Sequence, residues 1–380
     1  LRTEVNFLLG TSQIRRTVGR NFKKTMDYRK NNFDFLRLIF ASFVIITHSY
    51  PLSGIKECDF ICQLTFGQVS FSYVGVKGFF VISGYLIFQS LQRSENIFDY
   101  FWKRLLRLFP ALIVVLFLTV ILTPFVYQGD TPFFYNKSLL TYIPNNLSLY
   151  RTQYKIDGVF ENNPYKSVIN GSLWTIRYEF TMYILLSFLL IFRKKKIAIQ
   201  ILLLISFLLL LTANIFYFDK LKNYYFILSD RNLLDFGYFF IAGSLFAAIN
   251  IEKINRKREL LILISILLVA SIYFKFYIYS KYLTLPILFI MFGLNPIPFI
   301  YNIGEKIGDL SYGIYIYGFP VQQTLMYYFK LNYLELMVYS LIISYIFAYF
   351  SWHLIEKNAL RLKKLRPIIT RVSLRAEHEQ

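Results

Sequence analysis

The sequence is short of cysteine, histidine and acidic residues. Among 380 residues it has two cysteines, three histidines and 22 Asp or Glu against 42 Lys or Arg. Two cysteines are too few for a disulfide-rich scaffold. No histidine lies near Cys58 and Cys62 in the sequence, which disfavours a metal site there. On these residues alone, a short-loop disulfide and two free thiols both stay open.

The scarcity of acidic residues leaves a net charge of +20. In a soluble protein such a charge would indicate nucleic-acid binding. Near membrane spans, however, Lys and Arg fix the orientation of the chain. Most of the basic residues fall on one side of the spans expected below, for example in the short runs RKKK (193–196) and KINRKR (253–258). The charge therefore predicts orientation in a membrane, and no nucleic-acid partner is expected.

Long apolar runs are abundant, and 56% of the residues are hydrophobic, against about 45–50% in soluble proteins. Runs of about 20 apolar residues match the thickness of a bilayer. We therefore expect an all-α, polytopic membrane helix bundle of about ten transmembrane helices. The expected spans are 35–52, 73–91, 108–126, 173–192, 197–217, 233–250, 259–276, 282–300, 308–328 and 334–356.

An even number of spans puts both termini on one side, and the basic bias makes that side cytoplasmic. The sequence thus predicts a basic cytoplasmic tail over 1–33, a ten-helix membrane domain over 34–356 and a second basic cytoplasmic tail over 357–380. The segment 127–172 is expected to be a long extracytoplasmic loop. It is rich in Tyr, Asn and Asp, which suits sugar binding, while a lid that packs on the bundle is the alternative.

Arg37 and His48 lie near the two ends of the first expected span, within FDFLRLIFASFVIITH (33–48). Their spacing of 11 residues places both on one helix face, about 16 Å apart along the axis. Charged groups are costly in a bilayer and are therefore functional candidates. Arg37 also fits a residue that reaches the interface. His48 also fits a satisfied core group, although an imidazole suits proton transfer near neutral pH.

Two further clusters of charge lie in or beside expected spans. Arg104 and Arg107 are helix neighbours at the cytoplasmic end of the third span, where they suit phosphate binding or, alternatively, orientation of the span. Glu179 is expected about 10 Å below the outer end of the fourth span, at a depth similar to that of His48. A buried carboxylate needs a partner. His48 would serve, and Arg177 competes but points to another side of the helix.

Six stretches together resemble the acyltransferase 3 family of integral-membrane O-acyltransferases, of the surface-polysaccharide O-acetyltransferase type. The first-helix motif of this family is similar to FDFLRLIFASFVIITH, its Phe-Phe-x-x-Ser-Gly motif to GVKGFFVISGYLI, and its Arg-x-x-Arg pair to KRLLRLFP. Its later motifs are similar to GSLWTIRYEF, GDLSYGIYIYGFPVQQ and SWHLIEKNALRLKK. The six occur in the order of the family and span nearly the whole chain.

The resemblance implies transfer of an acyl group, commonly acetyl, from cytoplasmic acyl-CoA to a hydroxyl of a cell-surface or lipid-linked glycan, such as lipopolysaccharide O-antigen. It implies acetyl-CoA as the acyl donor, no metal, and a multi-pass location in the bacterial cytoplasmic (inner) membrane. It places the essential histidine at His48 with Arg37 as its motif partner, and donor binding at Arg104 and Arg107. We expect Glu179 to orient His48 or to stabilise its charged form. The expected partners are acyl-CoA, the glycan acceptor and membrane lipids.

Two positions depart from the family pattern. Lys77 stands where many relatives have Asp, and Gly318 stands where many have His, so any role of that second histidine cannot apply here. A polytopic glycan transporter or flippase without acyl transfer is the alternative function. Such transporters often have inverted halves, and no internal symmetry of this kind is visible in the sequence. Consumption of acyl-CoA with release of free CoA would distinguish the two.

Overall fold

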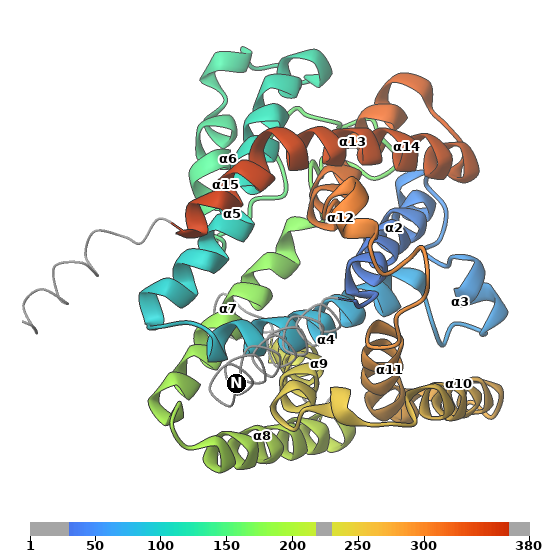
Figure 1. Cartoon of the computed structure of the whole chain (residues 1–380). Coiled ribbons are helices and arrows are strands. Elements are labelled where there is room, and N and C mark those ends of the chain that lie inside the picture. The colour runs from blue at the N-terminus through green and yellow to red at the C-terminus, as the bar shows by residue number, and fades with distance from the viewer. Residues whose placement is uncertain (1–29, 218–229, 365–380) are drawn as a thin grey trace, which may run out of the picture.

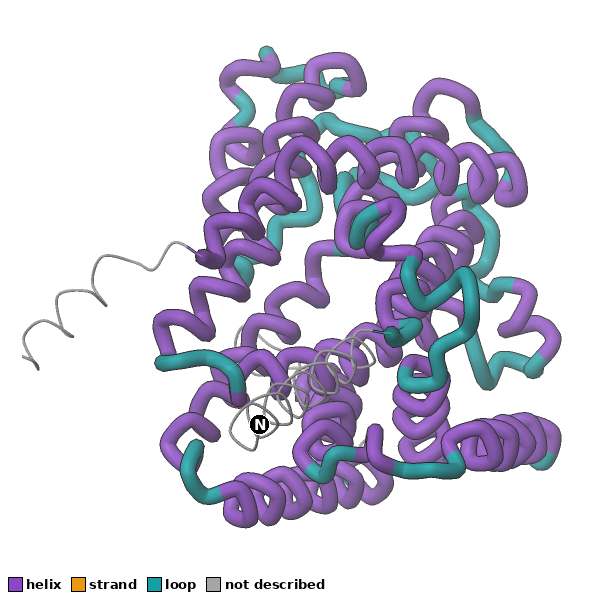
Figure 2. Tube along the Cα trace, viewed as in Figure 1, coloured by secondary structure: helices purple, strands orange, loops and turns teal. Residues whose placement is uncertain are grey.

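The computed structural model describes residues 30–217 and 230–364, and the two basic tails lie mostly outside them. Ten helices correspond to the ten expected spans within these ranges (Figure 1). They are α2 (Phe33–Leu52), α4 (Phe71–Gln92), α5 (Ile97–Leu122), α7 (Ile176–Ser187), α8 (Lys196–Phe216), α9 (Asp230–Ala248), α10 (Lys257–Tyr273), α11 (Tyr277–Gly293), α13 (Ser311–Phe329) and α14 (Tyr333–Ser351). The described ranges contain no β-strand (Figure 2), which confirms the all-α fold.

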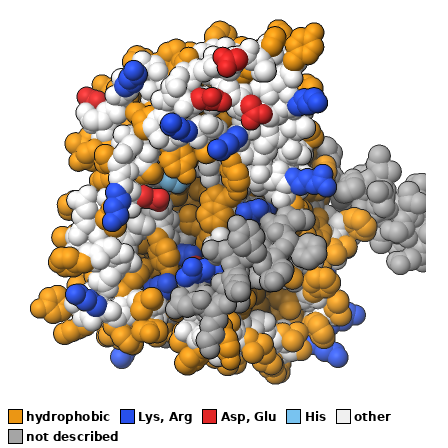
Figure 3. Space-filling model, turned by 180° about the vertical axis from the view of Figure 1, so that it is seen from behind, with side chains coloured by type: hydrophobic (Ala, Val, Ile, Leu, Met, Phe, Trp, Pro, Cys, Tyr) orange, Lys and Arg blue, Asp and Glu red, His pale blue; other side chains and the backbone are white. Residues whose placement is uncertain are grey.

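Six helical segments are long and apolar enough to cross a membrane: Phe33–Leu52, Phe71–Gln92, Ile97–Val126, Leu173–Phe192, Lys196–Phe216 and Tyr333–Arg361. Hydrophobic side chains also cover much of the molecular surface (Figure 3). In water such a surface would cause association, whereas lipid tails solvate it. The chain is therefore a membrane protein.

The boundaries of two expected spans differ from the helices that form. The third helix begins at Ile97 rather than 108, because the Asn96 side chain accepts a hydrogen bond from the Asp99 N–H and caps an earlier start. The eighth span was expected to reach residue 300, but α11 ends at Gly293. Pro296 and Pro298 follow, and proline both lacks an N–H and disfavours the helical conformation of the residue before it.

The glycines of GVKGFFVISGYLI serve close helix packing. A Cβ atom added at Gly84 of α4 would lie 1.9 Å from the carbonyl oxygen of Phe240, and one added at Gly243 of α9 would lie 2.0 Å from that of Val81. Both helices therefore need glycine at the crossing. The contact fixes α4 against α9 and turns its opposite face, with Ser83, toward the interior of the bundle.

The segment 127–172 packs on the bundle. It contains α6 (Lys137–Leu147), and the side chains of Ile156, Phe160 and Ile169 in it are fully buried. The Asn170 side-chain amide donates to the carbonyl of Ile316 at 2.9 Å, which ties the segment to α13. The segment thus packs on the bundle as a lid would, and its contribution to sugar binding stays a prediction.

Four short elements complete the part of the fold that matters for the site. A disulfide joins Cys58 to Cys62 around α3 (Phe60–Leu64). At the other end of the chain, α14 continues through a π-helical turn, Trp352–Glu356, into α15 (Lys357–Arg361). α12 (Ile303–Ile307) precedes α13. The described start of the expected C-terminal tail, 357–364, is therefore helical and packs beside α5 (Figure 1).

Candidate active site

A cavity of about 240 Å³ lies inside the bundle, with walls from α2, α4, α5, α7, α13 and the segment 352–363. Apolar side chains, chiefly of α4, form one wall. The charged groups on its lining are Arg37, Arg104, Arg107, Lys363, Glu179 and Asp309. Four cations thus face two carboxylates, so the lining has an excess of positive charge.

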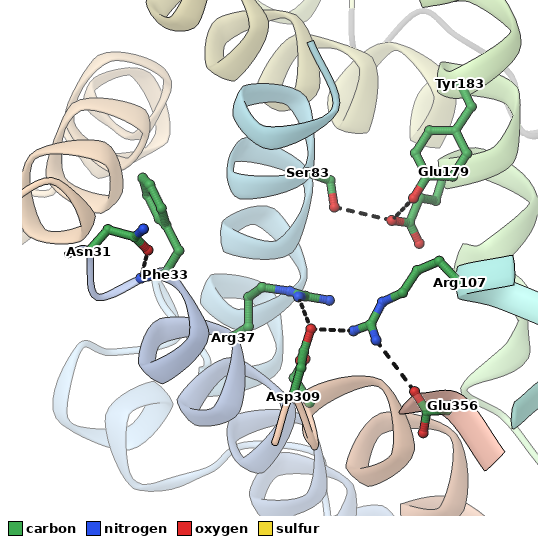
Figure 4. A network of polar contacts seen from close by, with 10 residues as sticks. Asn31, Phe33, Arg37, Ser83, Arg107, Glu179, Tyr183, Asp309 and Glu356 are labelled. Carbon is green, nitrogen blue, oxygen red and sulfur yellow. Dashed lines mark hydrogen bonds and ion pairs between the residues drawn. The ribbon is translucent and has the colours of Figure 1, made fainter. Parts of the chain in front are cut away.

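Asp309 joins two of the predicted site arginines. Its Oδ2 accepts hydrogen bonds from Arg37 Nη1 and Arg107 Nη2, each at 2.5 Å. Figure 4 shows the two guanidinium groups approaching this carboxylate from opposite sides. Arg107 also donates through Nη1 to Glu356 Oε2 at 3.4 Å. Arg107 therefore links two carboxylates, and much of its hydrogen-bonding capacity is already used.

The π-helical turn Trp352–Glu356 accounts for the position of Glu356. Single π-helical turns inside α-helices are frequent at functional sites, and this one places a carboxylate with only 2% of its surface exposed against Arg107. Trp352 packs on Gly308, where an added Cβ would lie 2.1 Å from the indole and φ is +95°. Only glycine fits both constraints, so the loop before Asp309 is held in one conformation.

Arg104 is buried but has no carboxylate partner among residues 30–217 and 230–364. Its Nη2 donates to Ser90 Oγ at 3.0 Å, and its Nε is buried without a hydrogen-bond partner. The rings of Tyr100 and Tyr183 flank the guanidinium at 6.0 and 5.9 Å. Buried donors are rarely left unsatisfied, so this side chain is suited to an anion from outside the protein.

Glu179 lies on the cavity wall but contacts partners other than those considered from its sequence. Its Oε1 accepts a hydrogen bond from Ser83 Oγ at 3.1 Å and another from the Tyr183 hydroxyl (Figure 4). In the described part of the chain, no hydrogen bond joins it to His48. Periodicity gives the depth of a residue in a helix, but the partner across the bundle depends on how the helices rotate and pack.

His48 lies beside the cavity rather than in its lining. Its ring makes an edge contact with Phe319 of α13, with 5.5 Å between the ring centroids. Phe319 comes four residues after Tyr315, which lines the cavity, so one helical turn, about 6 Å, separates the cavity wall from the residue that touches His48. The structure thus places the arginines on the cavity lining, whereas His48 contacts a residue one turn farther along α13.

The sequence of this chain matches an established family. The acyltransferase 3 model, described as an acyltransferase domain, matches residues 30–353. The chain belongs to the acyltransferase 3 family. This result confirms the resemblance inferred from the six motifs.

Two proteins of known name are similar to this acyltransferase. The "O-acetyl transferase" of Shigella phage Sf6 is 27% identical over 340 residues, which cover 88% of this chain and 97% of the relative. "Nodulation protein 10" of Rhizobium leguminosarum bv. viciae is 33% identical over 184 residues, which cover 44% of this chain and 46% of that protein. No solved structure matches the chain.

The departure of this acyltransferase at Lys77 has a structural counterpart. Lys77 forms a buried ion pair with Asp235 of α9, and its ammonium lies over the rings of Tyr73 and Phe236 at 4.7 and 4.3 Å. The lysine therefore faces α9 rather than the cavity. Lys77 joins the same two helices, α4 and α9, as the glycines do. This contact explains the presence of a lysine here without a direct role in acyl transfer.

Three residues of the site were not singled out from the sequence: Asp309, Glu356 and Lys363. All three lie in motif segments. Asp309 and Glu356 are rare acidic residues in or beside expected spans, a signal that could have identified them. Lys363 lies in a basic run, where orientation of the chain was a sufficient explanation. Only the fold brings all three to Arg104 and Arg107.

Proposed function

We propose that this protein transfers an acyl group, most simply acetyl, from cytoplasmic acyl-CoA to a hydroxyl of a cell-surface or lipid-linked glycan. Membership of the acyltransferase 3 family supports acyl transfer. The name of the phage relative, an O-acetyl transferase, supports an oxygen acceptor and an acetyl donor. The observation that carries the proposal is a cavity with an excess of positive charge whose wall residue Tyr315 lies one helical turn from Phe319, the residue whose ring contacts His48.

The donor site fits the chemistry of acyl-CoA. Coenzyme A is a polyanion with a long, thin pantetheine arm. Whole ligands of drug size usually occupy about 300–1,000 Å³, so the cavity of about 240 Å³ suits the arm and the thioester better than the entire molecule. Arginine is well suited to phosphate, and the cationic lining is at the end of the bundle where α2 and α5 begin.

His48 acts in this proposal as the general base. It takes the proton of the acceptor hydroxyl while that oxygen attacks the thioester carbonyl. The new C–O ester bond forms, the C–S bond breaks, and the CoA thiolate leaves and takes up a proton. Direct transfer and transfer through an acyl-histidine both satisfy this balance. Glu179 positions Ser83 and Tyr183 on the wall along which the arm would lie.

The acceptor reaches His48 from the opposite side of the membrane. In the orientation expected from the basic residues, both termini and the arginine end of the cavity face the cytoplasm of a bacterial cell, and the 127–172 segment lies outside the cytoplasmic membrane. Tyr165 of that segment contacts Phe319, the neighbour of His48, with 6.0 Å between ring centroids. The segment is thus near enough to help position a glycan at the histidine.

The direct test is mass spectrometry of surface glycan from cells with the gene, without it, and with His48→Ala. We expect one acyl substituent per modified sugar to disappear in the second and third strains. An unchanged glycan mass in the strain that lacks the gene would contradict the proposal. Under the transporter alternative, the acyl substituent would persist on glycan that remains inside the cell, and purified protein would release no free CoA.

A further inference from the structure

The four cations of the cavity fall into two classes. Arg37 and Arg107 both donate to Asp309, and Arg107 reaches Glu356 as well. Arg104 and Lys363 make no ion pair with a carboxylate of the described ranges. Breaking a buried pair is costly because it leaves an uncompensated charge. The first class therefore frames the site, and the second has charge to offer to a ligand.

Lys363 comes from the segment after the last long helix. It lies in one turn of 3₁₀ helix, Leu362–Lys364, directly after α15. The indole N–H of Trp102 on α5 donates to the carbonyl oxygen of Leu362 at 3.2 Å, which anchors this turn beside the helix that carries Arg104. Leu360 and Lys363 both line the cavity. The end of the described chain is thus a wall of the site.

The electrostatics around Lys363 favour an anion. Burial and the neighbouring positive charges of Arg104 and Arg107 lower the pKa of Lys363 to about 8. Lys103 acts in the same direction, and Asp309 opposes it. Like charges held this close repel each other, and a phosphate placed between them would relieve the repulsion.

We propose that Lys363 and Arg104 together bind a phosphate group of the acyl donor, so that the turn Leu362–Lys364 completes the donor site. The inference rests on the function proposed above, since it assigns the donor contacts of the same cavity. It changes the role of Arg107, which frames the site through Asp309 and Glu356 and leaves the donor contact mainly to Arg104. A lipid headgroup has the same phosphate chemistry, so the test separates the two sources.

The test is the affinity of purified protein for acetyl-CoA, measured by calorimetry in nanodiscs of zwitterionic phosphatidylcholine. We expect Lys363→Gln to bind acetyl-CoA about tenfold to a hundredfold more weakly than wild type, because one charge-assisted contact is lost. Lys363→Arg keeps the charge and should stay within a few-fold of wild type. Lys357→Gln is the matched control, since Lys357 is exposed on the same segment and should bind as wild type does.

A truncated donor tests whether phosphate is the group recognised. Acetyl-pantetheine lacks the nucleotide and its charges, so Lys363→Gln and wild type should bind it equally. An equal loss for both donors would indicate a distorted site and overturn the inference. A second set of discs, made with anionic phosphatidylglycerol, tests the lipid source. If the acyl donor is the ligand, Lys363→Gln weakens acetyl-CoA binding in both sets of discs. If lipid phosphate is the ligand, acetyl-CoA affinity does not depend on Lys363 in either set, which overturns the inference.

The two proposals fail in different ways. If wild-type protein binds acetyl-CoA and Lys363→Gln binds it equally well, the assignment of Lys363 is wrong and the proposed function stands. If wild-type protein binds neither acetyl-CoA nor longer acyl-CoA, the proposed function itself is wrong.

Discussion

Thr47 donates a 2.5 Å hydrogen bond to the carboxylate of Asp59, and this contact joins the residue before His48 to the loop closed by the Cys58–Cys62 disulfide. Asp59 is fully buried. It also accepts from the backbone N–H groups of Phe71 at 2.8 Å and Cys62 at 3.0 Å. One carboxylate therefore ties the C-terminal end of α2 to the N-terminal ends of α3 and α4 and limits the positions open to His48.

We expect Asp59→Ala to lower both the melting temperature and the rate of acyl transfer. The substitution leaves the buried Thr47 hydroxyl and two partly buried backbone N–H groups without their acceptor, and each hydrogen bond to a charged group contributes about 1.5–3 kcal/mol. Thermal unfolding in detergent and transfer assays on the same preparation would measure the two effects. Lys56→Ala, an exposed change three residues before Asp59, is the control. A variant Asp59→Ala with wild-type melting temperature and rate would show that this contact does not position the helix.

Arg104→Lys and Arg107→Lys should have different consequences. Lysine offers only a point charge in place of the guanidinium fork. At position 107 it cannot link Asp309 and Glu356 at once, so we expect a lower melting temperature. At position 104 it leaves every carboxylate pair intact, so we expect normal stability and acetyl-CoA affinity about tenfold weaker. Thermal unfolding and calorimetry on each variant separate these effects. An equal fall in melting temperature for the two variants would contradict the separate roles assigned to Arg104 and Arg107.

Donor binding should weaken at alkaline pH. With a pKa of about 8, Lys363 is mostly charged at about pH 7 and mostly neutral at about pH 9, and a bound phosphate favours the charged form. The affinity for acetyl-CoA should therefore fall roughly tenfold over this interval. The facing charges are those of Lys103, Arg104, Arg107 and Asp309. Lys363→Arg should give a nearly flat profile. A wild-type profile equally flat would argue against a donor contact at Lys363.

The orientation of the chain is open to labelling. In a Cys58→Ser, Cys62→Ser background, single cysteines placed in either tail should react with a membrane-impermeant reagent only in broken cells. A cysteine at exposed Lys137 in the 127–172 segment should react in whole cells, or in spheroplasts if the cell has an outer membrane. The prediction follows from the basic bias toward the side of the termini. Labelling of either tail from outside would reverse the map.

The sequence predicted the helices well because their signal is local. Apolar runs and helix spacing depend on neighbouring residues, and each of the ten expected spans overlaps a helix whose ends lie within a few turns of those expected. The contacts of the site are not local. Arg37 and Asp309 are 272 residues apart in sequence, and Arg107 and Glu356 are 249 apart. No periodicity specifies such pairs, because they depend on how helices rotate and pack.

The same limit explains the two outcomes for Glu179 and Arg107. Each was recognised from residue type and position, but its partner was not. Glu179 accepts a hydrogen bond from Ser83 of α4. The position of Ser83 depends in turn on the close contact of α4 with α9, which Gly84 permits. Arg107 could not be told from Arg104 by spacing. Their roles separate because the fold brings Asp309 and, through a π-helical turn, Glu356 to Arg107 and not to Arg104.

The most direct test of acyl transfer at His48 uses acetyl-CoA labelled in its acetyl group. Wild-type protein in proteoliposomes would receive the labelled donor on one side and, on the other, glycan from cells that lack the gene. We expect label to enter the glycan as an alkali-labile ester, with release of one free CoA per acetyl group. His48→Ala, with the melting temperature of wild type, should transfer no label. Transfer at the wild-type rate by that variant would contradict the account.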